Sequence, residues 1–379
     1  MRINLISLAK DSNDKRSWSG TPYMVLKSLQ AIGHEVNVLN YMPDKYPVFH
    51  RIIIRLYGVI SRATGKKYLY WFTSLFQKLL KKRYSQLRVL ESDLTFVVGQ
   101  SFLIPPIIPC KTKLVYLCDA TFSAVEDYYP EFSDLYKIVS CQGNRICREA
   151  LLACDKIIMS SNWAKQHAVE DYHISPAKID VVEFGANIVS VKMGSIERDY
   201  SNKQKYRILF SGVHWERKGG KIAVECCDYL ISKGYNIELI VAGVDVPMSY
   251  ERTYIRPVGF LNKNIEKEYV EYVRILEEAD FLLFPSKAEC SAIALCEAAG
   301  FSLPVFGYKT GGLENYVKDG FNGYLLTENN SGKEFAMKID EVIGRGELKE
   351  LSENSKILYT QTLNWTVWGE RVRTIINQL

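Results

Sequence analysis

Residues 207–243 read RILFSGVHWERKGGKIAVECCDYLISKGYNIELIVAG and contain the full pattern of one strand, one helix and a second strand. The apolar runs 207–213 and 237–243 predict the strands, and the stretch 221–233, which ends at Gly234, predicts the helix between them. Two strands joined by a helix lie parallel in one sheet with a right-handed crossover. The stretch therefore predicts one βαβ unit of an open α/β sheet.

A second unit of the same kind begins near the N-terminus. Residues 2–9 and 34–39 predict strands, and residues 22–32, with Pro22 in the first turn and Gly33 as the stop, predict a helix. Six further apolar runs predict strands, most of them separated by helical stretches: 94–98, 113–118, 156–160, 180–184, 281–284 and 304–306. The pattern starts twice, so it predicts the α/β class with two doubly wound, Rossmann-like domains.

A polar stretch separates the two halves of this pattern. Residues 187–204 contain few apolar residues and little periodicity, and they predict a linker with the domain boundary near residue 187. The expected domains are 1–187 and 188–364, and residues 365–379 are expected to form a C-terminal helix that packs back toward the N-terminal domain. A length of 379 residues agrees with this division, at about 150 residues per domain.

The composition excludes several classes of protein. Apolar residues make up 47% and charged residues 24%, which is typical of a folded globular chain and excludes a disordered or collagen-like one. No run reaches the ~18 apolar residues of a membrane span, and the opening run 3–9 meets Lys10 and Asp11 too early for a secretory signal. The nine cysteines contain no Cys-x-x-Cys pair, so they predict reduced thiols without structural zinc. We therefore expect a cytoplasmic protein.

Positive charge is concentrated in one segment of the chain. Residues 45–90 contain eleven Lys or Arg and no Asp or Glu, whereas the whole chain carries a formal charge of only +5. The eleven cations are Lys45, Arg51, Arg55, Arg62, Lys66, Lys67, Lys78, Lys81, Lys82, Arg83 and Arg88. Such local asymmetry indicates an anionic partner, which can be a lipid, a nucleic acid or a phosphate-bearing substrate.

Two turns have the composition of anion-binding sites. Neither βαβ unit carries Gly-x-Gly-x-x-Gly, which disfavours a dinucleotide-binding dehydrogenase. In the first unit Gly20 precedes a helix, whose N-terminal N–H groups can face an anion. In the second unit Arg217 and Lys218 stand just ahead of a glycine pair at the carboxyl end of a strand, where open α/β sheets hold phosphates. Two adjacent cations suit a diphosphate.

The stretch 288–300, AECSAIALCEAAG, is the sharpest element of the sequence. A helix of small residues is expected to start near Ser291 and to stop at Gly300, and its first N–H groups can hold a phosphate. Glu289 and Glu297 would lie about 12 Å apart if both were helical. That separation exceeds the roughly 5–9.5 Å between the paired carboxyl groups of a glycosidase. It suits two carboxylates that accept hydroxyl hydrogen bonds at opposite ends of a nucleotide sugar.

Several motifs occur together in a fixed order: Ser19-Gly20 in the first loop, Arg217-Lys218-Gly219, Glu289 with Glu297, the pair Gly311-Gly312, and DGFNGYLL at 319–326. In these motifs the chain resembles retaining glycosyltransferases of family 4, over nearly its whole length. The resemblance implies a GT-B fold, in which two Rossmann-like domains face a cleft. It further implies transfer of a hexose-type sugar from a nucleotide-diphosphate sugar to a glycan or lipid-linked acceptor, as in surface polysaccharide synthesis, with no cofactor.

The resemblance also implies roles for single residues. Lys218, together with Arg217, would hold the diphosphate, Glu297 would bind the ribose hydroxyls, and Glu289 would contact the donor sugar near its reacting end. Asp119 would serve the acceptor side, so Asp119 and Glu289 form the expected catalytic set. The remaining expected donor-binding residues contribute backbone groups: Gly20, Ser291, Ala292, Ile293, Ala294, Gly311 and Gly312. No Asp-x-Asp motif is present, so no catalytic metal is implied.

The sequence departs from the family pattern in three places. Val213 stands where many members have an Arg five residues before the Lys, so Arg217 is either its substitute or merely adjacent. Ser291 and Ala292 replace a Phe-Gly pair, which narrows the room beside the sugar. Cys118 replaces the histidine that commonly precedes Asp119, so a role that depends on histidine does not carry over.

Two other functions are compatible with parts of the sequence. A GT-B nucleotide-sugar epimerase would share the fold, but the order of the motifs favours transfer to an acceptor. A basic nucleic-acid-binding protein would explain the charge of residues 45–90, but apolar residues at helical spacing there indicate a packed or membrane-facing stripe instead. The stripe comprises Tyr68, Trp71, Phe72, Leu75, Phe76, Leu79 and Leu80. We therefore expect this segment to touch an anionic membrane surface.

Overall fold

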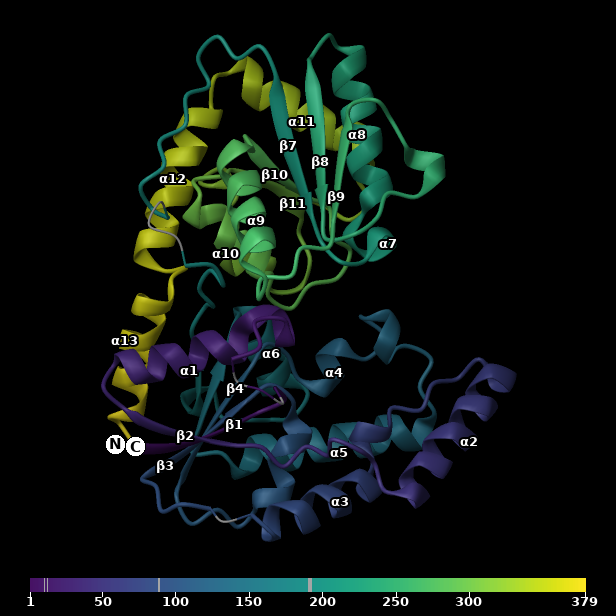
Figure 1. Ribbon diagram of the computed structural model, residues 1–379, viewed down its shortest axis with the longest axis vertical. Coiled ribbons are helices and arrows are strands. Elements are labelled where there is room, and N and C mark those ends of the chain that lie inside the picture. Colours follow the sequence, from purple (N-terminus) through teal and green to yellow (C-terminus); the bar gives the residue numbers. More distant parts are fainter. Residues whose placement is uncertain (10, 12, 88, 190–192) are drawn as a thin grey trace. The chain divides into compact units, whose positions relative to one another are not determined.

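The computed structural model describes residues 1–379 except 10, 12, 88 and 190–192, and it divides the chain into two compact units (Figure 1). Unit 1 comprises Met1–Val182 with Gly369–Leu379, and unit 2 comprises Glu183–Trp368. The division expected near residue 187 thus lies between Val182 and Glu183. The last helix, α13 (Trp365–Ile376), begins in unit 2, and its part from Gly369 onward belongs to unit 1.

Unit 1 is built on a parallel six-stranded sheet in the order β2-β1-β3-β4-β5-β6. In sequence order the strands are β1 (Arg2–Ser7), β2 (Glu35–Leu39), β3 (Leu94–Val98), β4 (Lys113–Cys118), β5 (Lys156–Met159) and β6 (Ile179–Val181). Every residue of β3 is buried, because helices cover both faces of such a sheet. This is why its central strands occur in the sequence as continuous apolar runs.

The helices of unit 1 occupy the connections between these strands. They are α1 (Thr21–Ala31), α2 (Val48–Thr64), α3 (Ser74–Ser85), α4 (Phe122–Val125), α5 (Lys137–Ala153) and α6 (Asn162–Glu170). Short 3-10 helices accompany them: η1 (Ser17–Gly20), η2 (Tyr70–Phe72), η3 (Ser101–Leu103), η4 (Pro105–Ile107), η5 (Pro130–Phe132) and η6 (Pro176–Lys178).

Unit 2 is built on a second parallel sheet in the order β12-β11-β10-β7-β8-β9. Its strands are β7 (Tyr206–Ser211), β8 (Ile237–Ala242), β9 (Ile255–Gly259), β10 (Phe281–Phe284), β11 (Val305–Tyr308) and β12 (Gly323–Leu326). Its helices are α7 (Trp215–Lys218), α8 (Gly220–Ser232), η7 (Met248–Tyr250), α9 (Glu266–Glu278), α10 (Ile293–Gly300), η8 (Gly311–Asn315), α11 (Gly332–Gly344) and α12 (Leu348–Gln361). Two doubly wound domains of the α/β class are therefore confirmed.

Two edge strands of unit 2 were missed by the sequence patterns. Strand β9 contains Pro257 and is only partly buried, and β12 begins with Gly323 and is partly buried beyond it. Edge strands tolerate proline and half-exposure because one side of the ladder has no partner strand. They therefore lack the continuous apolar run that marked the central strands.

The chain reverses its direction of travel across this second sheet at β7. From β7 it proceeds to β8 and β9 on one side, and it then returns to β10 on the other side. The carboxyl ends of β7 and β10 therefore form the topological switch point, where open α/β sheets bind their ligands.

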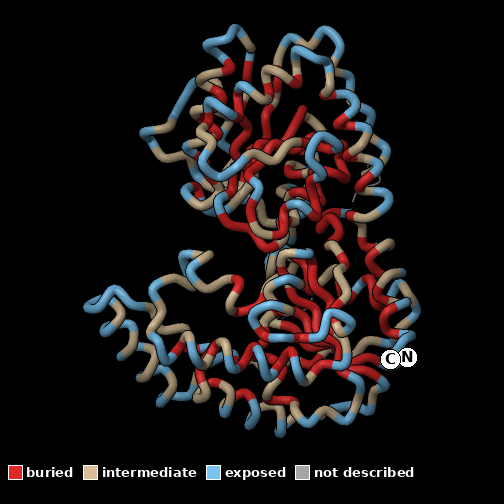
Figure 2. The backbone as a smooth tube through the Cα atoms, turned by 180° about the vertical axis from the view of Figure 1, so that it is seen from behind, coloured by how far each residue is buried: buried red, intermediate tan, exposed pale blue. Residues whose placement is uncertain are grey.

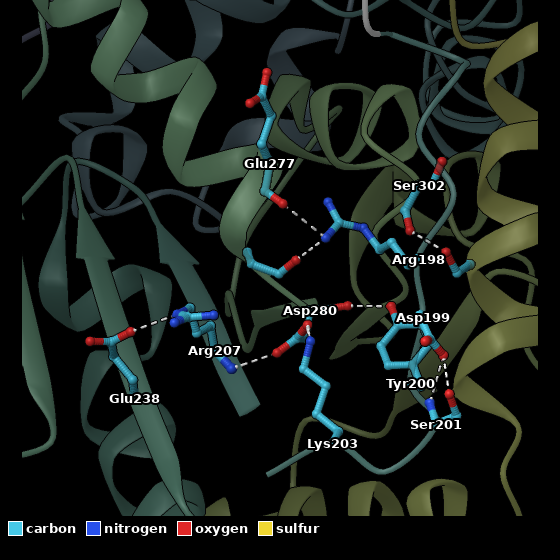
Figure 3. Close-up of polar contacts among 12 residues, drawn as sticks. Arg198, Asp199, Tyr200, Ser201, Lys203, Arg207, Glu238, Glu277, Asp280 and Ser302 are labelled. Atoms are coloured by element: carbon cyan, nitrogen blue, oxygen red, sulfur yellow. Dashed lines mark hydrogen bonds and ion pairs between the residues drawn. The ribbon is translucent and has the colours of Figure 1, made fainter. Parts of the chain in front are cut away.

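The polar stretch expected to be a linker, 187–204, belongs to unit 2, and its residues 190–192 lie outside the described part of the chain. Arg198 is held there by backbone carbonyls (Figure 3). Its Nη2 donates to Leu276 O at 2.7 Å and to Phe301 O at 2.8 Å, and its Nη1 donates to Glu277 O at 3.2 Å. These carbonyls lie at the carboxyl-terminal ends of α9 and α10, where acceptors lack intrahelical partners. One cation therefore caps two helices.

A second contact holds the same stretch to the sheet. Tyr200 Oη donates to Asp280 O at 2.7 Å, and Lys203 pairs with the Asp280 carboxylate, which also accepts from Arg207 N at 2.7 Å (Figure 3). The polar composition that predicted a linker thus reflects side chains that satisfy buried polar groups of unit 2.

The basic segment 45–90 is also organised differently from the expectation, and Arg88, like Lys10, lies outside the described residues. The expected helical stripe is interrupted, because Tyr70–Phe72 form η2 and helix α3 begins only at Ser74. Phe72, Phe76 and Leu80 are buried in the core of unit 1. For these three side chains the packed alternative is therefore confirmed and the membrane-facing one is wrong, whereas Trp71 of the same stripe is 47% exposed. In the described part of the chain, no helix is long and apolar enough to cross a membrane.

Candidate functional site

Ten of the twelve predicted site residues belong to unit 2, and they lie in the segments that follow β7, β10 and β11. Arg217 and Lys218 form the end of α7, the short helix after β7. Glu289 lies in the loop between β10 and α10, and Glu297 lies on α10 itself. The structure thus brings the cationic pair and both glutamates to the topological switch point of this sheet.

Two glycines shape the surroundings of Lys218. A Cβ atom on Gly212 would stand 2.6 Å from Lys218 Cγ, so a larger residue there would displace the lysine stem. Gly219 has a φ of +77°, and a Cβ on it would stand 2.1 Å from Pro285 O. The glycine therefore allows the turn after α7 to approach the loop after β10 closely. Lys218 Nζ lies 4.5 Å from the centroid of the Phe284 ring.

The carboxylate of Glu289 is the centre of a buried polar cluster. Its Oε1 accepts hydrogen bonds from Lys218 Nζ at 2.5 Å, Arg217 Nη1 at 2.8 Å and Ser286 Oγ at 2.6 Å. Glu289 is only 5% exposed. Burial lowers the pKa of Lys218, whereas the charge of Glu289 opposes that shift. Two cations and one carboxylate leave one net positive charge in this cluster when all three are ionised.

Backbone hydrogen bonds fix the loop that carries Glu289. Lys287 N donates to Arg217 O at 2.9 Å, and Gly312 N donates to Glu289 O at 3.1 Å. Thr310 Oγ1 adds a hydrogen bond to Lys287 O at 3.2 Å. The loops after β7, β10 and β11 are thereby joined, which places the predicted pair Gly311 and Gly312 beside the Glu289 loop.

Helix α10 begins next to this cluster. It starts at Ile293 with Ala292 as its N-cap, two residues later than expected, so Ser291 precedes the helix. The first N–H groups of a helix lack intrahelical acceptors and carry partial positive charge, and those of Ile293 and Ala294 occupy these positions. Ser291 Oγ is buried and has no hydrogen-bond partner among the described residues. This end of α10 can therefore donate hydrogen bonds to an anion.

Glu297 has a separate pair of partners. Its Oε1 pairs with Lys263 Nζ, and its Oε2 accepts a hydrogen bond from Tyr272 Oη at 2.8 Å. Glu297 is 2% exposed. Burial, and secondarily the charge of Glu297, raises the pKa of Tyr272 well above its ordinary value, so this hydroxyl stays a donor. The separation of about 12 Å between Glu289 and Glu297 was expected only if both were helical. Glu289 precedes α10, so that expectation does not apply.

The other two predicted residues belong to unit 1. Gly20 ends η1 with a φ of +93° and is the N-cap of α1. Asp119 directly follows β4 and is partly buried. Burial, with a contribution from Asp119, raises the pKa of the Cys118 thiol well above its ordinary value, so this cysteine stays protonated. Within unit 1, both predicted residues therefore lie in segments that follow strands.

Sequence reasoning missed three side chains of the unit 2 site: Ser286, Lys263 and Tyr272. Ser286 was detectable, because it stands two residues after the apolar run 281–284. Lys263 follows β9, which the sequence did not reveal as a strand, and Tyr272 lies on α9, 25 residues away from Glu297. Among the described residues no group of three His, Cys, Asp or Glu could hold a metal ion.

The sequence of unit 2 matches the model of a known protein family. Residues 195–357 match the family model described as glycosyl transferases group 1, and they include all ten candidate residues of this unit. An uncharacterized glycosyltransferase of Methanocaldococcus jannaschii is 28% identical over 249 residues, which are 63% of this chain and 64% of that protein. The chain spans 64% or less of the length of the first curated relatives that it matches.

Solved structures resemble the chain over its whole length. WaaG, a glycosyltransferase involved in lipopolysaccharide biosynthesis, has a TM-score of 0.61 at 17% identity, with 99% of each chain covered. HepE of Anabaena, solved in complex with UDP and glucose, has a TM-score of 0.63 at 16% identity, with 100% of each chain covered. At these identities the likeness shows the fold, which is the GT-B type.

Proposed function

We propose that this chain, which contains a glycosyl transferases group 1 domain over residues 195–357, is a glycosyltransferase that moves a sugar from a nucleotide-diphosphate sugar to a glycan or lipid-linked acceptor. One observation carries the proposal: Arg217 and Lys218 meet Glu289 beside the start of α10, at the switch point of the second sheet. Cations and free helix N–H groups together favour a diphosphate. HepE, which shares the fold, was solved with UDP and glucose.

In this proposal the cationic pair stabilises the leaving group. As the bond between the sugar's anomeric carbon and the diphosphate oxygen breaks, negative charge grows on that oxygen. Arg217 and Lys218 face it from fixed positions in a site where Lys218 is largely buried. Glu289 holds both cations in place, and we assign to it the contact with the donor sugar.

Glu297 serves the other end of the donor. Its carboxylate is a buried hydrogen-bond acceptor, held by Lys263 and Tyr272. A carboxylate accepts two hydroxyl hydrogen bonds readily, which suits the vicinal hydroxyls of ribose. We assign this role to Glu297, and we assign phosphate contacts to the backbone at the start of α10.

The acceptor side belongs to unit 1 in this proposal, with Asp119 in the acceptor region. We propose that the reaction retains the anomeric configuration. The acceptor oxygen forms its bond to the anomeric carbon on the face from which the diphosphate departs, and the acceptor proton passes to a diphosphate oxygen. No cofactor or metal takes part in the proposed reaction.

We also propose a cytoplasmic site of action. All nine cysteines are free thiols, and seven of them are buried. Nine cysteines without a disulfide are typical of a protein in a reducing compartment such as the cytoplasm.

The proposal is tested with the full-length protein and a panel of UDP, GDP and ADP, each compared with its monophosphate and with inorganic phosphate. At least one diphosphate should raise the melting temperature clearly more than its monophosphate, because only the diphosphate spans the cationic pair and the start of α10. Its sugar conjugates are then incubated with glycan and lipid-linked acceptors, and nuclear magnetic resonance of the product reports the anomeric configuration. No preference for any diphosphate would contradict the donor assignment, and inversion would contradict the proposed course of the reaction.

A further inference from the structure

Helix α2 (Val48–Thr64) has no buried residue, although it carries several large apolar side chains. In Figure 2 it is drawn entirely in the colours of exposed and intermediate residues. Six of its large apolar side chains are exposed: Val48 62%, Phe49 62%, Ile52 56%, Leu56 56%, Val59 63% and Ile60 37%. The sequence analysis expected the segment 45–90, which contains this helix, to touch an anionic membrane surface, but it assigned the apolar stripe to Tyr68–Leu80.

The six side chains form one face of the helix. At about 100° per residue, their positions fall within an arc of roughly 120° around the helix axis. This is the width of the apolar stripe by which an amphipathic helix normally faces a core. In α2 the stripe faces away from the core of unit 1.

The opposite side of α2 is the side that holds it to unit 1. The Tyr57 ring stacks on Tyr68, with centroids 3.5 Å apart, and His50 Nδ1 hydrogen-bonds to Tyr70 Oη. Ile54 packs against the hydrophobic core of the same unit. The helix is therefore held to unit 1 by this side, and its apolar face is exposed at the surface.

Positive charge borders this apolar face. Arg51, Arg55 and Arg62 are all exposed and fall within about 40° of one another around the axis, along one edge of the face. The exposed Lys66 lies two residues after the end of the helix. No Asp or Glu occurs between residues 45 and 90, so no carboxylate of this segment offsets these charges.

We propose that α2 is a membrane-docking helix, which lies flat in the headgroup region of an anionic lipid bilayer with its apolar face toward the acyl chains. The combination of a wide apolar face and a row of cations fits an interface that is apolar inside and negatively charged at its surface. A second copy of the chain is a poorer occupant, because it would add a second row of arginines and no carboxylate from this segment to balance them. The proposal goes beyond the transfer reaction and does not depend on it.

The test is co-sedimentation of the full-length protein with vesicles of phosphatidylcholine alone or with about one third phosphatidylglycerol. We expect binding to the anionic vesicles only, and a decrease of at least tenfold in that binding when salt is raised to about 1 M, because the Debye length then shortens to about 3 Å. Equal binding to both kinds of vesicle, or no binding to either, would overturn the proposal.

Two triple variants separate the apolar face from the charged edge. The first removes apolar contacts with Phe49→Ser, Ile52→Ser and Leu56→Ser, and the second removes charge with Arg51→Gln, Arg55→Gln and Arg62→Gln. Each should lower vesicle binding by at least tenfold. Matched controls change three exposed residues of the same kinds on unit 2: Met248→Ser, Val270→Ser and Ile357→Ser for the first, and Lys233→Gln, Lys267→Gln and Lys349→Gln for the second.

The controls should bind vesicles as the wild type does. Melting temperature and UDP binding by unit 2 are measured on every variant, and they should remain unchanged, because all six substituted side chains of α2 are exposed. If the apolar triple variant binds anionic vesicles as well as the wild type, the assignment to α2 is wrong. If it instead changes the oligomeric state while vesicle binding persists, the face is a protein interface and the lipid proposal fails.

Discussion

Lys218 Nζ lies 2.5 Å from Glu289 Oε1, so the cation expected on the diphosphate and the carboxylate expected near the sugar are direct partners. They stand 71 residues apart in the sequence and come from the loops after β7 and β10. A diphosphate must therefore share Lys218 with Glu289. Removing Glu289 would leave two buried cations without a carboxylate, whereas removing Lys218 would leave Glu289 paired with Arg217 alone.

Lys218→Ala should weaken the binding of nucleoside diphosphates, because it removes the buried cation beside the start of α10. We expect a loss on the order of 1.5–3 kcal/mol in binding free energy, measured with UDP and ADP by titration calorimetry. The matched control is Lys221→Ala, an exposed lysine on α8 that pairs with Glu225 at the surface. Equal affinities of the Lys218 variant and the wild type for both nucleotides would remove Lys218 from the donor site.

Glu289→Gln should lower the turnover rate without lowering the affinity for the donor. The amide keeps the side chain's size but removes the negative charge, so Arg217 and Lys218 face the diphosphate with more net positive charge. We expect donor affinity to be kept or increased, while kcat falls by about 10²-fold or more, because the carboxylate acts near the reacting centre. The measurement is kcat and KM with the same donor. A folded variant with an unchanged kcat would place Glu289 outside the catalytic set.

The affinity for diphosphates should depend on pH through Lys218. Its pKa is lowered by burial, and the ammonium is the form that attracts phosphate, so affinity should fall as pH rises through that lowered pKa. In Glu289→Gln the carboxylate no longer raises the pKa of Lys218, so the fall should begin at a lower pH. Lys218→Arg is the control, because a guanidinium does not titrate in this range. If its pH profile is the same as that of the wild type, Lys218 is not the group responsible.

Glu297→Ala should abolish recognition of the ribose. Wild-type protein should bind UDP more tightly than its 2′-deoxy or 3′-deoxy analogue, by about 1–3 kcal/mol, because a buried carboxylate otherwise loses a hydroxyl partner. In the variant all three nucleotides should bind alike. Tyr272→Phe should keep the discrimination but weaken it, since it removes only the hydroxyl that positions Glu297. Undiminished discrimination in Glu297→Ala would refute the ribose assignment.

Arg198→Met should destabilise unit 2. The guanidinium caps α9 and α10, and without it their terminal carbonyls lose charged hydrogen-bond donors. We expect the free energy of unfolding to fall by about 1.5–3 kcal/mol in urea denaturation. Arg274→Met on α9, whose exposed guanidinium pairs with Glu271, should change it by at most about 1 kcal/mol. Equal effects of the two substitutions would show that the capping contacts contribute nothing specific.

The sequence by itself determined the fold class and the loops that form the unit 2 site. Strands β3, β4 and β10 were predicted with their full extent, because a strand buried on both faces of a parallel sheet must be a continuous apolar run. Arg217 and Lys218 were recognisable for a related reason. Glycines and charges at the end of a predicted strand can lie only at the edge of the sheet, where a ligand can reach them.

Only the tertiary structure decided which side chains meet and which apolar faces remain exposed. The pairing of Glu297 with Lys263 and Tyr272 depends on where α9 and β9 pack, and local sequence does not encode that placement. The same holds for the basic segment, because α2 and the Tyr68–Leu80 stripe have similar compositions. Apolar periodicity shows which side of a helix is apolar, but it does not show what that side packs against. Tertiary packing buries Phe76 and leaves Phe49 exposed at the surface.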